Sequence, residues 1–327
     1  RLRRRGFGQK FRTEILNLKT AKEPDKNIGS DCILILGKEN FLTLERISMD
    51  TITLLKLPEI KQKIKNFYDA SSPYWAEIWG EHIHDGYYLT GKESKEEAQE
   101  NLIRLLAEKA NIQKGSKILD VGCGIGGTSI YLAKNFSTHT TGITLSPVQV
   151  EMAQKQAKRQ HVNSIFSVMD AERMDFPKSF DVLWIVGVLT HFIDQENFIK
   201  HATKFLNKGG KFVLGDWMVA EDITDTERKK FVQPVLHGML MPNSYSINTY
   251  LGWFIKYGYR IVYAEDITVR TTKTWDIALS LIKKPALWKL AYQEGTTFVN
   301  FLRCIRAMRR AMQEGKLRYG VVVAEKL

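Results

Sequence analysis

The feature that most constrains the fold of this chain is a short apolar strand that ends in a run of glycines. Residues 118–127 read ILDVGCGIGG, so that Asp120 stands just before Gly122, Gly124 and Gly126. Glycines let a backbone turn tightly and approach a ligand without a Cβ atom in the way. A strand that ends in such a turn is typical of nucleotide-binding sheets with helices on both faces.

The acidic residue in this turn indicates what kind of ligand the turn would hold. The third glycine comes one residue early, as GxGxG, and Asp120 precedes the first glycine. A carboxylate would repel the pyrophosphate of a dinucleotide, whereas it would attract the α-ammonium group of S-adenosylmethionine. The turn therefore favours S-adenosylmethionine over NAD. The alternative is a glycine turn that only packs a strand against a helix.

Strands and helices alternate between residues 93 and 218, and this order predicts a parallel sheet wrapped by helices on both faces. Ligands bind such sheets at the carboxyl ends of the strands. A helix is expected over 127–135 and another from Ser146, where Pro147 suits the first helical position. Further strands are expected at 139–145, 165–171, 180–187 and 211–219, with a turn at 207–210. The final third is expected to be helical apart from two strand-like segments near 259–268 and 319–326.

Composition and charge exclude several classes of protein. The chain has 327 residues, of which 44% are hydrophobic and 26% charged, as is ordinary for a globular protein. No apolar run approaches the roughly 18 residues that a membrane-spanning helix needs. The first 65 residues contribute +7 of the formal charge of +12. Because no helix-turn-helix, zinc-finger or aromatic RNA-binding motif accompanies this charge, no nucleic-acid partner is expected.

The cysteines and the N-terminal residues bear on compartment and on metal binding. Cys32, Cys123 and Cys304 are scattered and odd in number, which argues against disulfides and for a reducing, cytoplasmic compartment. No Cys/His cluster has the spacing of a metal site, so no metal is expected. Residues 1–58 form a basic extension that begins RLRRR and is interpreted as a solvated leader rather than a transit-like arm.

The motifs around the predicted sheet are similar to those of a known enzyme family. ILDVGCGIGG resembles the first motif of class I S-adenosylmethionine-dependent methyltransferases, and FDVLWIVGVLTHF and LNKGGKFVLGD resemble its later strands. FYDASSPYWAEIWGEHIHDGYY and GITLSPVQ resemble more narrowly the gamma-tocopherol methyltransferase-like small-molecule enzymes. The resemblance implies a Rossmann-like α/β fold: a doubly wound, seven-stranded, mostly parallel sheet with a helical substrate cap and an N-terminal lid.

The resemblance also implies which residues bind S-adenosylmethionine. Asp120 would lie near the ammonium end, and Asp170 would accept from the adenine amine. Nucleotide-binding sheets usually place an acid for the ribose after the second strand, but this chain has Thr144 there and Gln149 five residues later, a pair that replaces the acid in related branches. The implied cofactor residues are Tyr68, His84, Gly86, Tyr87, Asp120, Gly122, Cys123, Gly124, Gly126, Thr144, Leu145, Gln149, Asp170, Ala171 and Gly187.

Two regions outside the sheet are expected to complete the site. The aromatic segment 59–92 would fold over the cofactor as a lid that excludes water, the alternative being an amphipathic packing helix. In the methyltransferase domain, 93–327, helical cap insertions are expected at about 219–258 and 272–315. Weaker candidates for contact with the substrate are Asp216, Trp217 and His237. The basic amphipathic helix at 301–320 is interpreted as solvated rather than bound to a membrane surface.

His191 is the residue expected to act as a base, because it follows the fourth strand and histidine titrates near neutral pH. Its alternative role is packing. Relatives of the tocopherol and cyclopropane-synthase types usually carry Glu before this His, where this chain has Thr190. Cyclopropane synthases use that Glu to place a bicarbonate base, so cyclopropanation of an alkene is not expected.

The predicted function is methyl transfer to a small-molecule acceptor by in-line displacement. The acceptor would be a phenolic, prenyl-quinol or other electron-rich carbon, or an amine. An N-methyltransferase of an alkaloid or glycine-like amine would show an acid facing the amine, or an Arg for a carboxylate. A cofactor-binding protein without turnover is the alternative from another class.

Overall fold

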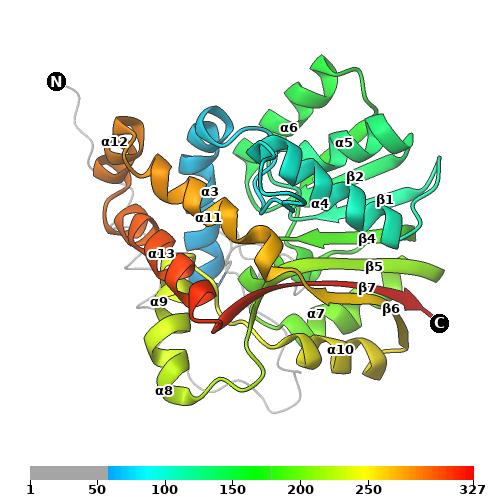
Figure 1. Cartoon of the computed structure of the whole chain (residues 1–327). Helices are drawn as coiled ribbons and strands as arrows, with labels where there is room; N and C mark the ends of the chain where they lie inside the picture. The colour runs from blue at the N-terminus through cyan, green and yellow to red at the C-terminus, as the bar shows by residue number, and fades with distance from the viewer. Residues whose placement is uncertain (1–57, 178) are drawn as a thin grey trace, which may run out of the picture. The chain divides into compact units, whose positions relative to one another are not determined.

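A seven-stranded sheet forms the centre of the computed structural model, which describes residues 58–177 and 179–327 (Figure 1). The strand order is β3-β2-β1-β4-β5-β7-β6, and β7 runs antiparallel to both of its neighbours while the other pairs are parallel. The predicted mostly parallel sheet is therefore confirmed. The strands are β1 Lys117–Val121, β2 His139–Thr144, β3 Ser164–Val168, β4 Phe180–Val186, β5 Leu206–Val219, β6 Tyr259–Asp266 and β7 Leu317–Lys326.

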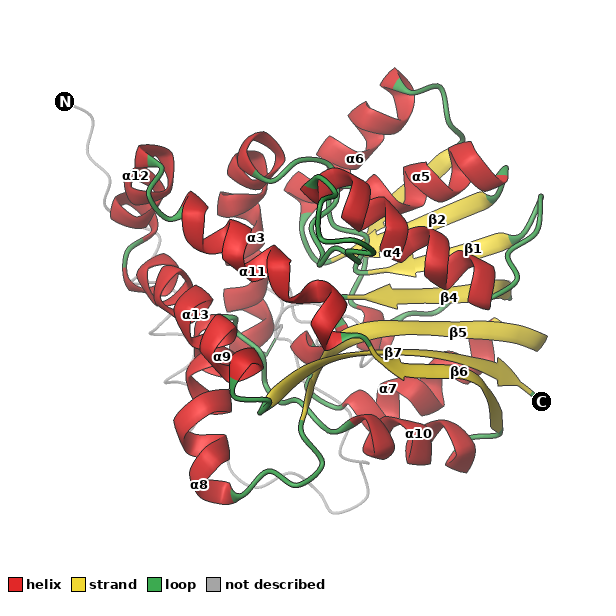
Figure 2. Ribbon diagram, in the orientation of Figure 1, coloured by secondary structure: helices red, strands yellow, loops and turns green. Residues whose placement is uncertain are grey.

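Helices cover both faces of this sheet (Figure 2). The α-helices are α3 Glu59–Ile78, α4 Lys95–Lys109, α5 Gly127–Phe136, α6 Pro147–Arg159, α7 Gln195–Ala202, α8 Asp225–Glu227, α9 Gln233–Gly238, α10 Ile247–Lys256, α11 Thr268–Leu281, α12 Pro285–Glu294 and α13 Thr296–Gln313. The described residues also form three short 3₁₀ turns and one π-helical turn. These are η2 Ala171–Arg173, η3 Leu189–His191, η4 Thr203–Phe205 and the π-helical η5 Arg228–Val232.

Alternate residues of β1 and β5 enter two separate cores, because successive side chains of a strand point to opposite faces. A third, smaller cluster joins α5 and α6 to Phe166 of β3. Ile118 and Val213 pack in one core with α4, α9, α11, α12 and α13. Their neighbours Leu119 and Leu214 pack in the other core with α7 and α10. The second predicted cap insertion thus joins a core of the sheet, and α10 of the first insertion packs against β6 and α7.

The start of α6 is as the sequence predicts. Ser146 caps this helix by accepting a hydrogen bond from the backbone N–H of Gln149 at 3.1 Å, and Pro147 fills the first helical position. This cap matters for the site, because it fixes the turn between β2 and α6.

Two strand ends differ from the prediction. β3 ends at Val168, so Asp170 lies beyond the strand and caps η2 by accepting from the Glu172 backbone N–H at 3.1 Å. β5 already begins at Leu206, so the predicted turn at 207–210 is an irregularity inside the strand. The pairing of β5 with β4 shifts register there, and Gly209 supplies the positive φ of 75° that this irregularity contains.

The predicted basic extension, 1–58, and Cys32 lie outside the described residues, apart from Pro58. Among the helices that the structure describes, none combines the length and the apolarity needed to cross a bilayer. No group of three or more His, Cys, Asp or Glu residues within 58–177 and 179–327 is arranged to hold a metal ion.

Candidate active site

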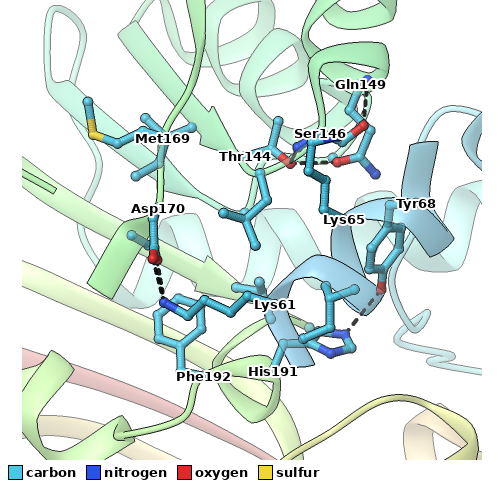
Figure 3. A pocket seen from close by; sticks show the side chains of 18 of the residues that line it. Lys61, Lys65, Tyr68, Thr144, Ser146, Gln149, Met169, Asp170, His191 and Phe192 are labelled. Carbon is cyan, nitrogen blue, oxygen red and sulfur yellow. Dashed lines mark hydrogen bonds and ion pairs between the residues drawn. The ribbon is translucent and has the colours of Figure 1, made fainter. Parts of the chain in front are cut away.

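A pocket opens at the carboxyl ends of β1, β2, β3 and β4, and α3 forms one of its walls (Figure 3). We call it the sheet-edge pocket. It encloses about 810 Å³ of space, open solvent at its mouth included. It is lined by Lys61, Ile64, Lys65, Tyr68, Ile83, Gly122, Gly124, Ile143, Thr144, Leu145, Ser146, Gln149, Met169, Asp170, Ala171, Val186, Gly187, Val188, His191 and Phe192.

The glycine turn after β1 forms the floor of this pocket. The backbone N–H of Gly122 donates to the Ile143 carbonyl at 2.8 Å, which ties the turn to β2. Gly124 has a φ of +53°, and a Cβ atom on it would meet nothing within 4 Å, so open space remains beside the backbone. Gly126 does not line the pocket, because a Cβ there would lie 2.8 Å from the Ala153 Cβ of α6. That glycine lets the turn pack against α6.

A smaller hollow, which we call the Asp120 hollow, adjoins the sheet-edge pocket and shares Gly122 and Gly124 with it. Asp120 is buried and accepts a hydrogen bond from the Ser129 hydroxyl at 2.6 Å. Burial raises the pKa of Asp120 to about 6, and hydrogen bonds from Ser129 oppose that rise. Of the described residues that line the hollow, none is Lys or Arg. A carboxylate without a cationic neighbour suits a ligand that brings its own positive charge.

Cys123 lines the same hollow, where burial raises the pKa of its thiol well above the usual value. His84 also lines it. Burial lowers the pKa of His84 to about 4, so the ring is neutral near pH 7. Its Nδ1 lies 2.8 Å from the Asp85 carbonyl, and because a carbonyl only accepts, Nδ1 carries the proton and Nε2 is left without a partner.

Thr144 and Gln149, which replace the expected acid, lie in direct contact. The Thr144 hydroxyl donates to Gln149 Oε1 at 2.6 Å, and Gln149 Nε2 donates to the Ser72 hydroxyl of α3 at 3.0 Å. Both residues are buried and both line the sheet-edge pocket. Gln149 therefore links the turn after β2 to α3.

The structure places an unpredicted residue, Lys61 of α3, against Asp170. Its ammonium group lies 2.6 Å from the Asp170 carboxylate and 2.7 Å from Glu172, and its side chain is only 5% exposed (Figure 3). The sequence held a signal for this contact. Lys61, Tyr68 and Ser72 recur at helical spacing and put their polar groups on one face of α3, toward the pocket.

Half-buried Tyr68 and buried His191 form a pair where the sheet-edge pocket meets α3. The Tyr68 hydroxyl lies 3.1 Å from His191 Nε2, and His191 Nδ1 lies 3.3 Å from the Leu240 carbonyl (Figure 3). Since the carbonyl only accepts, Nδ1 carries the proton and Nε2 accepts from Tyr68. Burial lowers the pKa of His191 to about 4, so the ring is neutral at physiological pH. Burial also raises the pKa of Tyr68.

A second cavity, the aromatic pocket, opens beside the first and holds about 660 Å³. Tyr68, Ile83 and Gly187 line both pockets. The aromatic pocket is mostly apolar, and its described lining residues include four tryptophans and one carboxyl group. Its lining comprises Phe67, Tyr68, Trp75, Trp79, Ile83, His84, Asp85, Gly187, Trp217, Met239, Thr274, Trp275, Ala278, Phe301 and Ile305.

Several residues singled out in the sequence lie away from these pockets. Gly86 packs against α4, where a Cβ would lie 2.7 Å from Ala98 Cβ, and the Tyr87 backbone N–H donates to the Ala98 carbonyl at 2.7 Å. This part of the predicted lid is therefore anchored to α4 in the structure. His237 is exposed at the end of α9 and lines none of the three cavities.

Asp216 is fully buried beneath η3 rather than facing a pocket. It accepts from the Thr190 backbone N–H at 3.1 Å and from the Thr190 hydroxyl at 3.0 Å. Burial raises the pKa of Asp216 to about 6. Its neighbour Trp217 lines the aromatic pocket.

The chain is similar in sequence and in fold to known proteins. A sequence model of the mycolic acid cyclopropane synthetase family matches residues 56–314. The chain is 30% identical to 27-O-demethylrifamycin SV methyltransferase of Amycolatopsis mediterranei over 79% of this chain and 95% of that protein. It is 25% identical to a chloroplastic tocopherol O-methyltransferase of Arabidopsis thaliana over 82% of each. A crystal structure of a mycolic acid cyclopropane synthase complexed with SAH and CTAB superposes with a TM-score of 0.73 at 18% identity, covering 83% of this chain and all of that one.

The buried ion pairs of Lys61 give a stability prediction. Lys61→Met removes the buried cation that two carboxylates share and leaves only the more exposed Arg173, 4.0 Å from Asp170, so we expect the free energy of unfolding to fall by up to about 3–5 kcal/mol. The matched control is Lys63→Met on the same helix, because Lys63 forms an exposed pair with Glu59. That variant should lose at most about 1 kcal/mol. Urea unfolding measures both, and equal losses would contradict the structural role of Lys61.

Proposed function

The chain belongs to the mycolic acid cyclopropane synthetase family, and on that premise we propose that its two joined pockets hold the donor and the acceptor of a methyl transfer. It is a class I S-adenosylmethionine-dependent methyltransferase that acts on a small molecule. The observation that supports this assignment of the pockets is their junction at Tyr68, Ile83 and Gly187.

S-adenosylmethionine supplies a methyl group on a positively charged sulfonium. We assign its amino-acid end to the Asp120 hollow, because Asp120 has no cationic neighbour there. Thr144 and Gln149 at the pocket wall offer a hydroxyl and an amide to the ribose, and Asp170 with Ala171 would hold the adenine. The donor and acceptor groups of these side chains fit such a molecule.

The aromatic pocket is proposed to hold the acceptor. Its apolar walls suit a ring-bearing molecule, such as a phenol, a prenyl-quinol or an apolar amine. The likeness to proteins named for tocopherol and for a demethylrifamycin supports a small organic acceptor. Because the pocket is walled by large side chains, a bound acceptor would be shielded from water while its nucleophilic atom is held toward the junction.

His191 and Tyr68 are proposed to manage the proton at this junction. Neutral His191 has a lone pair on Nε2, which now accepts from Tyr68. A histidine with a pKa of about 4 is a weak base, so it suits an acceptor that loses its proton readily once it is methylated. We do not propose cyclopropanation, because Thr190 gives its hydroxyl to Asp216 and offers no carboxylate beside His191.

We also propose a reducing, cytoplasmic location. Cys123 and Cys304 are both buried and unpaired. Buried free thiols support a compartment in which disulfides do not persist.

The pKa of Asp120 gives a prediction on cofactor binding. The ionised carboxylate attracts the ammonium group, so affinity for S-adenosylhomocysteine should be constant above pH 7 and fall as the pH drops through about 6. Well below that pH the fall should approach about tenfold per pH unit. Asp120→Asn should bind weakly at every pH. Calorimetry between pH 5 and 8 measures this, with Asp175→Asn, an exposed carboxyl outside the pockets, as the control. No binding of either S-adenosylmethionine or S-adenosylhomocysteine by the unaltered chain would overturn the proposed function.

A rate measurement tests His191. We expect His191→Ala to transfer labelled methyl groups at least 10-fold more slowly. Loss of a general acid or base typically slows a reaction roughly 10²–10⁴-fold, and a weak base such as His191 contributes at the low end of that range or just below it. The acceptors tested would be phenols, prenyl-quinols and amines. The affinity of the variant for S-adenosylhomocysteine should equal that of the unaltered chain. His139→Ala, at the exposed start of β2, is the control. An unchanged rate in His191→Ala would remove this residue from the mechanism.

A further inference from the structure

Asp85 is the one carboxyl group among the residues that line the aromatic pocket. It is 2% exposed, and its Oδ1 has no hydrogen-bond partner. The indole nitrogens of Trp217 and Trp275, which line the same pocket, lie near enough to Asp85 to lower its pKa, but neither makes a hydrogen bond of good geometry. Buried polar groups in proteins are nearly always paired, so a cluster of unpaired ones on a cavity wall indicates a ligand that pairs them.

Asp85 is a proton donor in this pocket, because its raised pKa keeps the carboxyl group largely protonated near pH 7 while no cation of the described lining residues faces it. Burial raises the pKa of Asp85 to about 8, the indole N–H groups of Trp275 and Trp217 oppose the rise, and the nearby charge of Asp216 adds to it. Of the described residues that line the pocket, none is Lys or Arg, and burial keeps His84 neutral. The chain therefore supplies no positive charge to face Asp85 inside the pocket.

The walls of the pocket suit the same kind of ligand. Trp75, Trp217 and Trp275 line the pocket together with Asp85. Aromatic ring faces attract cations, and an indole does so most strongly. A neutral phenol could pair one indole N–H or one carboxyl oxygen, but it is too weak a base to take the proton of Asp85. An amine takes that proton, and the ammonium and carboxylate groups that result compensate each other's charge.

We propose that Asp85 anchors a basic nitrogen of the acceptor, so that the substrate class of this enzyme is apolar amines. The inference rests on the proposed function, since it concerns the acceptor pocket of that methyl transfer. In this arrangement the ammonium group pairs with the Asp85 carboxylate and the apolar part of the molecule lies against the tryptophans. Asp85 acts as a specificity-determining residue, whereas the junction at Gly187 and Tyr68 faces the methyl donor.

The experiment compares three bicyclic probes of similar size: an amine and an ether that differ only in the ring heteroatom, and a phenol. The full chain, saturated with S-adenosylhomocysteine, is titrated with 1,2,3,4-tetrahydroisoquinoline, with its ether counterpart isochroman, and with the phenol 5,6,7,8-tetrahydro-2-naphthol. Binding is followed by the fluorescence of the pocket tryptophans and by calorimetry. We expect the amine to bind at least 10-fold more tightly than the ether and the phenol. Equal binding of amine and ether, or tighter binding of the phenol, would overturn the proposal.

The isosteric variant Asp85→Asn assigns the effect to the carboxylate. It should lose at least 10-fold in affinity for the amine, keep its affinity for isochroman within threefold, and bind S-adenosylhomocysteine as before. Asp175→Asn is the matched control. An unchanged preference for the amine in Asp85→Asn would contradict the assignment. The comparison of probes on the unaltered chain needs no variant, so it holds even if Asp85→Asn is unstable.

The failures of the two proposals can be told apart. If the unaltered chain does not bind S-adenosylhomocysteine, the proposed function fails. If it binds S-adenosylhomocysteine but shows no preference for the amine, only the role of Asp85 fails.

Discussion

The site depends on the buried polar contacts that hold α3 across the carboxyl edge of the sheet. Lys61 pairs with Asp170 beyond β3, Tyr68 with His191 after β4, and Ser72 with Gln149 after β2. A buried polar group without a partner raises the free energy of the folded state. Each of these contacts therefore holds α3 against the turn that supplies the partner. The position of α3 and the positions of three strand ends are therefore one structural unit.

This unit explains why two pockets exist and why they meet. The polar face of α3 closes the sheet-edge pocket, while Phe67 and Trp75 of the same helix line the aromatic pocket. Tyr68 lies between these faces and borders both cavities. One amphipathic helix thus separates a polar chamber, suited to a charged nucleoside, from an apolar chamber in which Asp85 is the one carboxyl group among the described lining residues.

The sequence alone predicts the parts of the fold that depend on residues close together in the chain. The glycine turn after β1, the cap of α6 and the alternation of strands and helices depend on neighbouring residues, and they gave the parallel sheet and the edge where its ligands bind. The contact of Thr144 with Gln149 also follows from their spacing across one strand end and one helical turn. Their role toward the ribose stays a prediction.

The remaining parts depend on contacts between distant segments. Lys61 meets Asp170 across 109 positions, and no local pattern says which strand end a helix at 59–78 will cross. Asp85 stands in a segment expected to act as a lid, but only the fold shows that it lies among tryptophans from α3, β5 and α11. The placement of His237 on the surface likewise depends on how α9 packs against α13.

The central claim is that α3 and the strand ends form the cofactor site as one unit. Amide hydrogen exchange of the full chain with and without S-adenosylhomocysteine tests it most directly. The ligand should slow exchange in α3, residues 59–78, together with the turn at 122–126, and leave α10, on the far side of the sheet, unchanged. Protection of the turn with no change in α3 would contradict the account.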